Sequence, residues 1–184
     1  YWAPIYSITN DSSGQAVVIQ VPYEVATGTV TAKVTGTNSV TTTVTGVQVK
    51  PYMPGILETT ISSRTVALAS RADGSRVTTA NPAKLGEQVR IYLTGLGQTT
   101  PAAATNTYAS ADQLVQAKII VGLDNRGYDV TKASLVQNSI GIYEVIFTMP
   151  NDVTTGSYRP IVILLQDTAG NSYYSNASVI AISN

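Results

Sequence analysis

Polar and β-branched residues alternate along much of this chain, and this alternation limits the fold more than any other feature of the sequence. Residues 29–35 alternate Thr or Lys with Val or Ala, and residues 40–49 resume the pattern after a Gly-Thr-Asn turn. A period of two places alternate side chains on opposite faces of a β-strand. The apolar set changes face near Gly46, which predicts a bulge or bend there. The pattern predicts a β-hairpin in this region and an all-β fold.

Seven further strand candidates follow a proline- and glycine-rich break at residues 51–55. Two prolines and a glycine in so short a stretch are typical of a linker. Turns separate the later candidates at fairly regular spacing, which is typical of an immunoglobulin-like β-sandwich. Residues 96–113 are rich in small side chains and are expected to form an exposed loop, with a helical turn near 109–114. The strand candidates are residues 65–70, 88–94, 115–123, 128–136, 141–149, 158–166 and 173–182.

A short internal repeat decides the expected domain layout. In each copy an apolar strand ends at a proline, and Val and Gly follow three and six residues later: Pro22, Val25 and Gly28 in the first copy, and Pro150, Val153 and Gly156 in the second. Only 21 residues precede the first proline, whereas about 90 lie between the linker and the second. The first unit is therefore expected to have the closing strands of a sandwich without the opening ones.

This repeat predicts a partial immunoglobulin-like unit over residues 1–50, a linker over 51–55 and a complete sandwich over 56–184. A sheet with an uncovered face and a free edge is a liability for a soluble protein. Two explanations stay open at this point. Either the first unit has been truncated, or a neighbouring copy of the chain supplies the strands that it lacks.

Several motifs in the same order resemble the Solibacter-type C-terminal domain, an uncharacterised β-domain found on many secreted acidobacterial proteins. The resemblance implies tandem immunoglobulin-like units in an exported protein, and it implies no catalytic residues. Family members carry a further strand-rich segment before the first motif, and its absence here agrees with the gap that the repeat indicates. The matching stretches are residues 4–8, 18–24, 54–56, 73–75, 80–83, 89–97, 141–145 and 149–150.

The composition excludes several classes of function. The chain has no histidine and no cysteine, which removes zinc sites, thiol nucleophiles and imidazole bases. Its 11 basic and 11 acidic residues are scattered, so no basic run could neutralise a row of phosphates. No apolar stretch is long enough to span a bilayer. A catalytic carboxylate pair is not expected either, because Glu144 is predicted to point to solvent from its strand. We therefore expect neither an enzyme nor a cofactor.

Two weak ligand sites remain as hypotheses. Asp124, Asn125 and Asp129 gather oxygen ligands around a turn, as calcium prefers, although Asx residues are also common in ordinary hairpin turns. Trp2, Tyr173 and Tyr174 could offer aromatic rings to a polysaccharide, although tyrosine also packs commonly at sandwich edges. Since residues 173 and 174 are adjacent in a strand, one of the two rings is expected to be exposed.

The sequence favours a non-catalytic structural module outside the cell. In this interpretation the chain forms a homo-oligomer or polymer, as a subunit of a surface fibre or layer whose strands or faces a neighbouring copy completes. The low charge of the chain, 12% of residues, suits such an assembly because repulsion between copies is small. The alternative is a carbohydrate-binding or adhesion module of a larger secreted protein.

Overall fold

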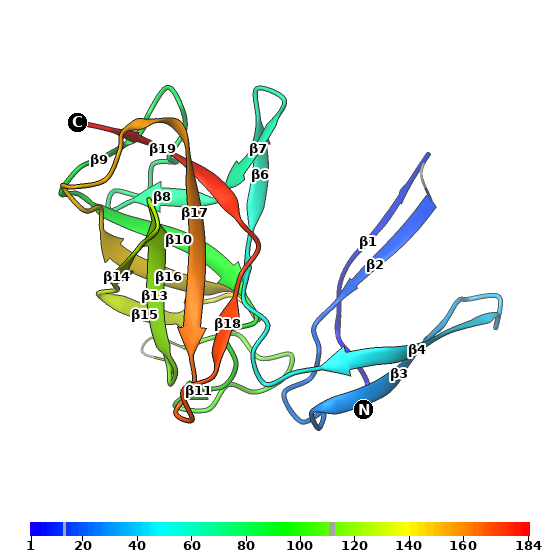
Figure 1. Ribbon diagram of the computed structural model, residues 1–184. Helices are drawn as coiled ribbons and strands as arrows, with labels where there is room; N and C mark the ends of the chain where they lie inside the picture. Colours follow the sequence, from blue (N-terminus) through cyan, green and yellow to red (C-terminus); the bar gives the residue numbers. More distant parts are fainter. Residues whose placement is uncertain (13, 111–112) are drawn as a thin grey trace. The chain divides into compact units, whose positions relative to one another are not determined.

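The computed structural model describes residues 1–12, 14–110 and 113–184, and every regular element in these ranges is a β-strand (Figure 1). The strands belong to two compact units. Unit 1 comprises Tyr1–Pro51 and Ala104–Asn106, and unit 2 comprises Tyr52–Ala103 and Thr107–Asn184. The all-β prediction is confirmed. Within the described ranges, no helix has the length and apolar character needed to cross a membrane.

Unit 2 is a two-sheet β-sandwich, consistent with the immunoglobulin-like sandwich that the strand spacing predicts. The first sheet has the strand order β11-β12-β15-β16-β10-β5, with β8 also paired to β10. Its strands are β5 (Gly55–Ile56), β8 (Ala69–Arg71), β10 (Gln88–Thr94), β11 (Thr99–Thr100), β12 (Leu114–Val115), β15 (Lys132–Leu135) and β16 (Tyr143–Thr148).

The second sheet of unit 2 has the strand order β14-β13-β17-β19-β9, with β18 paired to β17. A separate hairpin, β6 (Glu58–Ile61) and β7 (Arg64–Ala67), lies between β5 and β8 in the chain. The strands of the second sheet are β9 (Ala83–Lys84), β13 (Lys118–Leu123), β14 (Arg126–Asp129), β17 (Gly156–Gln166), β18 (Ser172–Tyr174) and β19 (Ser178–Ser183).

The core of unit 2 lies between these sheets and follows from the alternation along their strands. Val89, Ile91 and Leu93 on β10 are fully buried, while the residues between them are partly exposed. The facing sheet contributes the equally buried Ile163 and Leu165 from β17. Burial of branched side chains contributes about 1.5–3 kcal/mol each, so this core is the main source of stability in unit 2.

Four of the expected strands are each divided in two, namely 65–70, 115–123, 128–136 and 173–182. Leu68 separates β7 from β8: its N–H donates to Leu57 O, and its carbonyl accepts the N–H of Tyr92. Residues 175–177 separate β18 from β19, and there the hydroxyl of Ser175 accepts the N–H of Ile163 in place of a backbone carbonyl. A local side-chain bond of this kind competes with the strand ladder.

The segment 96–113 is exposed over most of its described length, as the prediction of an exposed loop requires, but it also contains the short strand β11 and several buried residues. Leu96 and Thr99 are buried in unit 2. Side-chain amides satisfy the enclosed backbone: Gln98 Oε1 accepts the N–H groups of Thr99 and Ala103, and Gln113 Nε2 donates to a carbonyl of the same loop. Part of the expected helical turn, residues 111 and 112, lies outside the described residues.

The linker expected at residues 51–55 is instead mostly docked on unit 2. Met53 N–H donates to Gly95 O at 2.9 Å, and Gly55 is the first residue of β5, which pairs with β10. The side-chain amide of Asn176 accepts the N–H of Ile56 at 2.7 Å and donates to its carbonyl at 3.3 Å. The prolines and the glycine predict a break in this segment, but composition does not indicate its hydrogen-bond partners on β10 and at Asn176.

Unit 1 consists of two β-hairpins, β1 (Ile5–Asp11) with β2 (Gly14–Ile19), and β3 (Gly28–Thr35) with β4 (Thr41–Val49). The second was expected, together with its bulge: Val30 lies opposite Val47 and Ala32 opposite Val44, so β4 has an extra residue near Gly46. Strand β1 was missed. Its pairing shifts at Tyr6, and that extra residue breaks the alternation on which the prediction depends.

Candidate interaction surface on unit 1

The internal repeat has the same local structure in both units. Gly28 begins β3 with φ of 130°, and Gly156 begins β17 with φ of 154°. Both values lie in the region that favours glycine. Each glycine lies six residues after the proline that closes the preceding strand. Strand β2 is therefore the counterpart of β16, and β3 is the counterpart of β17.

The two copies of the repeat differ completely in burial. Val145, Phe147 and Met149 at the end of β16 are each 0% exposed. Their counterparts in unit 1, Val17, Ile19 and Val21, are 37%, 41% and 54% exposed. A pattern that builds a core in unit 2 thus builds an open surface in unit 1.

The hairpin β1–β2 has one apolar face. Ile8 lies opposite Val17 and Ile5 opposite Ile19, and alternation places these four side chains on the same side. All four are exposed. The other face carries mainly small and polar residues, such as the pair Thr9 and Ala16, together with the exposed Val18 opposite Ser7.

The hairpin β3–β4 is divided in the same way. The cross-strand pairs Val30–Val47 and Ala32–Val44 lie on one face, which also carries Val34. The opposite face carries pairs of polar residues, namely Thr29–Gln48, Lys33–Thr43 and Thr35–Thr41. Two of these polar pairs are joined by side-chain hydrogen bonds, of 2.7 Å from Gln48 to Thr29 and 2.9 Å between Thr35 and Thr41.

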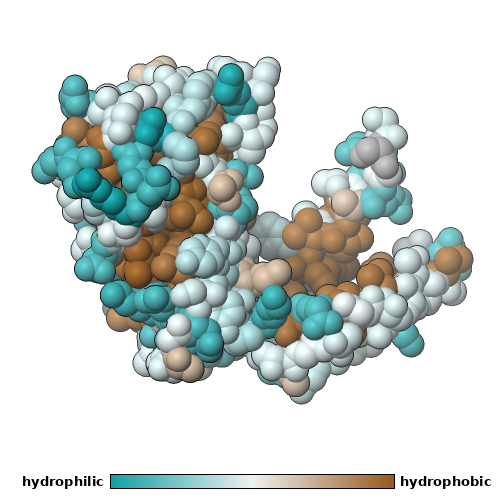
Figure 2. Space-filling model, in the orientation of Figure 1, coloured by the Kyte–Doolittle hydropathy of each residue, from teal (hydrophilic) through white to brown (hydrophobic). Residues whose placement is uncertain are grey.

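These two faces form what we call the apolar faces of unit 1: Ile5, Ile8, Val17 and Ile19 on the first hairpin, and Val30, Ala32, Val34, Val44 and Val47 on the second. Figure 2 shows hydrophobic residues at the surface of unit 1 in brown. Soluble monomers rarely expose a contiguous apolar patch above about 300–600 Å², and larger ones mark interaction sites. Chemically, this surface can bind apolar side chains and, at its strand edges, another β-strand.

The expected calcium ligands are not brought together. Asp124 and Asn125 lie in the turn between β13 and β14, whereas Asp129 lies at the far end of β14, opposite Ile120. The Asp124 carboxylate accepts the N–H of Thr154 at 2.5 Å and pairs with the guanidinium of Arg159. Across residues 1–12, 14–110 and 113–184, no group of three or more acidic residues is arranged to hold a metal ion.

The contacts of Asp124 give unit 2 a specific acid sensitivity. The backbone N–H of Thr154, followed by Arg159, lowers the pKa of Asp124 from 3.8 to about 2. A carboxyl group whose pKa is lower in the folded state stabilises the fold above its unfolded pKa, and this contribution is lost as the pH falls through the folded value. The contribution is therefore complete above about pH 4 and disappears towards pH 2.

We expect Asp124→Asn to lower the urea midpoint of unit 2 at pH 7, because the amide cannot pair with Arg159 as a charge. The difference from the unmodified chain should persist down to about pH 4 and shrink between about pH 4 and 2. Urea titrations followed by circular dichroism at several pH values measure it. Asp129→Asn, which alters an exposed carboxylate of the same hairpin, is the matched control and should change little. A difference that stays constant down to pH 2 would contradict this assignment.

The three aromatic candidates have separate surroundings. Trp2 is 97% exposed and belongs to unit 1, whereas Tyr173 and Tyr174 lie on β18 of unit 2. Tyr173 is half-buried against the ring of Tyr52, with 5.3 Å between ring centroids, and its hydroxyl donates to Asp167 at 3.3 Å. Tyr174 is 66% exposed. As expected from strand geometry, one ring of the adjacent pair is free to contact a ligand.

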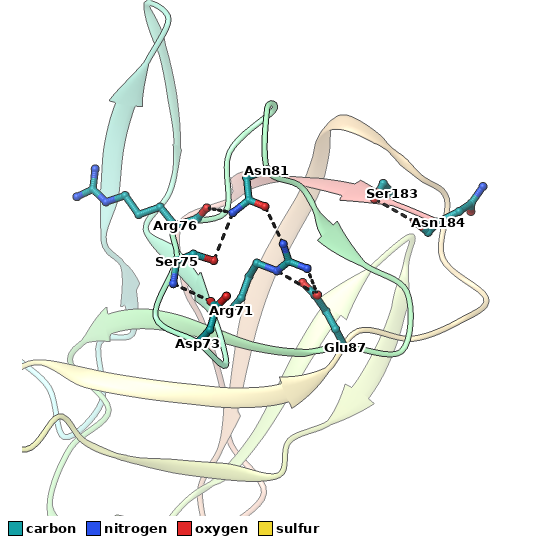
Figure 3. Close-up of polar contacts among 8 residues, drawn as sticks. All are labelled: Arg71, Asp73, Ser75, Arg76, Asn81, Glu87, Ser183 and Asn184. Carbon is teal, nitrogen blue, oxygen red and sulfur yellow. Dashed lines mark hydrogen bonds and ion pairs between the residues drawn. The ribbon is translucent and has the colours of Figure 1, made fainter.

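The polar cluster in Figure 3 is occupied by its own internal bonds. Arg71 Nη2 donates to Glu87 Oε2 at 2.6 Å, and Arg71 Nη1 donates to Asn81 Oδ1 at 2.7 Å. Asn81 in turn donates to the carbonyl of Arg76 and the hydroxyl of Ser75. The hydrogen bonds to Glu87 raise the pKa of Arg71. These contacts hold the loop that precedes β9 in place, which is a structural role.

Glu144 is less open to solvent than its strand position indicates. It lies between the buried residues Tyr143 and Val145, so its side chain leaves the opposite face of the sheet. There it pairs with Arg90 Nε at 2.8 Å and accepts a bond from Ser134 Oγ at 3.3 Å, and it is only 13% exposed. These two contacts of Glu144, with Arg90 and Ser134, involve no second carboxylate, which a carboxylate acid–base pair would need.

No protein-family model matches this chain, and no curated protein matches it at a significant level of sequence similarity. The resemblance to the Solibacter-type domain therefore rests on the quoted motifs and stays a prediction.

Sequence reasoning identified the alternation in β3 and β4 but missed the contribution of β1 to the surface. Ile5 and Ile8 belong to the same apolar face although they are three residues apart, because Tyr6 is the extra residue of a bulge. The signal that could have located them is the pair of apolar runs, 5–8 and 17–19, on either side of a polar turn containing Gly14.

Proposed function

We propose that this chain is a non-catalytic structural module that acts outside the cell and self-associates through the apolar faces of unit 1. The observation that carries the proposal is the contrast between the two copies of the repeat: the residues that build the core of unit 2 have solvent-exposed counterparts in unit 1. An exposed surface of this kind is stabilised when a partner removes it from water.

The polar chemistry of the chain supports a structural role over a catalytic one. With no histidine or cysteine, catalysis would depend on carboxylates, lysines or hydroxyl groups. Several carboxylates are engaged by arginines within unit 2 instead, in the pairs Arg71–Glu87, Arg90–Glu144, Arg126–Asp152 and Arg159–Asp124. A location outside the cell is supported by the low charge and by the resemblance to secreted proteins.

Val44→Lys and Thr43→Lys test the proposal as a matched pair on strand β4. Both residues are exposed, so neither lysine should unfold the isolated chain. Val44 lies on the apolar face and Thr43 on the polar face. We expect Val44→Lys to weaken self-association at least about a hundredfold, because its ammonium group would lose water on assembly. Thr43→Lys should leave the affinity within about threefold.

Light scattering over a range of concentrations measures both effects. A monomer at every concentration in the unmodified chain, or equal effects of the two lysines, would contradict the proposal. Retention of the chain on insoluble polysaccharide distinguishes self-association from the alternative function, which is carbohydrate binding. A carbohydrate module would be retained as a monomer and would lose retention with Tyr174→Ala, which removes the exposed ring of β18.

A further inference from the structure

Residues Ala104–Asn106 belong to unit 1, although the residues on either side of them in the chain belong to unit 2. They lie between β11 and β12, far along the sequence from the rest of unit 1. We call these three residues the strap. The residues just before the strap are bonded within unit 2, where Gln98 Oε1 accepts the N–H of Ala103 at 2.8 Å and Gln113 Nε2 donates to Ala102 O at 3.2 Å. The strap is therefore a short excursion of the chain into unit 1.

Three hydrogen bonds join the strap to the segment that follows β2. The N–H of Tyr23 donates to Thr105 Oγ1 at 2.9 Å, and Thr105 Oγ1 donates to Glu24 Oε2 at 2.6 Å. The N–H of Asn106 donates to Gln20 Oε1 at 2.9 Å. The hydroxyl of Thr105 thus accepts one bond and donates another, and the bond to the carboxylate is of the stronger, charge-assisted kind. The donation from Thr105 also lowers the pKa of Glu24.

The segment bonded by the strap connects β2 to β3 and so joins the two hairpins of unit 1. It contains a turn in which the N–H of Val25 donates to Pro22 O at 3.2 Å. Among residues 1–12 and 14–51, Pro22 alone is buried. The partners of the strap lie on both sides of this proline in the sequence, so the strap bonds to unit 1 where unit 1 is most enclosed.

The two hairpins have little else that fixes one with respect to the other. Among the described residues, no strand of the first hairpin pairs with a strand of the second. The residues of their apolar faces are mostly exposed, so these faces supply no closed core. An isolated two-stranded hairpin is also marginally stable in water. The arrangement of the hairpins therefore depends on the connecting segment and on the bonds that hold it.

From these contacts we infer that the strap is a conformational lock on unit 1. While it is bonded, it fixes the segment between the hairpins, and its release lets the two hairpins move independently while unit 2 stays folded. Thr105 is the positioning residue of the lock, because its hydroxyl makes two of the three bonds. The lock determines whether the apolar faces of unit 1 are presented in one arrangement or in several. It acts within a single chain, so the inference does not depend on the proposed self-association.

Thr105→Val tests the lock, because it removes the hydroxyl and keeps nearly the same shape. Amide hydrogen exchange of the full chain, followed by NMR at one protein concentration, gives the readout. The amide of Asn106 is the critical one, since its acceptor Gln20 is untouched by the substitution. If the strap is released as a whole, exchange should rise about tenfold at both Tyr23 and Asn106, while the amides of β10 exchange as before. Glu24→Gln, which removes only the charge of the acceptor, should give a smaller rise at the same two amides.

Thr27→Val is the matched control, since it makes the same change at an exposed threonine of the connecting segment. It should leave exchange at Tyr23 and Asn106 within about twofold. A rise at Tyr23 alone would show that the bonds act separately, and it would overturn the lock. Equal effects of the control, or an equal rise in β10, would overturn it as well. A chain that stays monomeric in light scattering would contradict the proposed function and leave the lock standing.

Discussion

Phe147→Ala should destabilise unit 2 by about 3–5 kcal/mol, because it removes a large side chain from a closely packed core. Phe147 is the single phenylalanine of the chain and is fully buried on β16. Its removal leaves a cavity that the surrounding strands can fill only in part. For a unit of this size the loss corresponds to a fall in the melting temperature of roughly 10–20 °C. Thermal unfolding followed by circular dichroism measures it.

Ile19→Ala is the matched control, because Ile19 occupies the same position of the repeat in unit 1 and is exposed. At a concentration where the chain is monomeric, we expect this change to alter stability by no more than about 0.5 kcal/mol. Comparable losses from the two substitutions would mean that unit 1 already has a packed core of its own. That result would remove the basis of the proposed interaction surface.

Gly95→Ala should destabilise unit 2 by about 2–5 kcal/mol, since it combines backbone strain with a steric collision. Gly95 has φ of 76°, and a Cβ atom there would lie 1.9 Å from Met53 O. That carbonyl belongs to the segment that docks on the end of β10, where Met53 N–H donates to Gly95 O. The chain must therefore move away from β10 to accept a methyl group.

Gly74→Ala distinguishes backbone strain from steric collision. Gly74 has a similar φ of 84°, but no atom lies within 4 Å of the added Cβ. Strain alone should make this control cost about 1–2 kcal/mol. Urea unfolding of both variants gives the comparison. Equal losses would show that the Met53 segment gives way freely, and its docking on β10 would then contribute little to stability.

The fold class could be predicted because alternation and turn residues act locally. The expected strand 88–94 coincides with β10, where buried and exposed positions alternate without interruption. The bulge near Gly46 was also visible, since an extra residue changes the face of every later side chain. Such features depend on neighbours in the chain, which the sequence displays directly.

Features that depend on distant partners could not be predicted. The buried positions within residues 96–113, such as Ala103, depend on amide groups of Gln98 and Gln113 that bond to backbone atoms several residues away. The calcium hypothesis treated Asp124 as a free ligand, but Arg159 and Thr154, about thirty residues later, occupy its carboxylate. Composition shows which groups are present, but not which partner each one finds after folding.

The candidate surface could be predicted from the sequence only in part. The repeat indicates which strands of unit 1 correspond to strands of unit 2, and in the described residues β2 pairs only with β1 and β3 only with β4. Which side chains form the apolar faces required the strand register, because the shift at Tyr6 hides the relation between Ile5 and Ile8.

Amide hydrogen exchange of the full chain, at two protein concentrations about a hundredfold apart, tests the central claim most directly. An amide on an open strand edge exchanges with solvent, and pairing with another strand protects it. We expect the amides of β2 and β3 to become protected at the higher concentration, while those of β10 and β16 exchange equally in both samples. Exchange in β2 and β3 that does not depend on concentration would contradict self-association through unit 1.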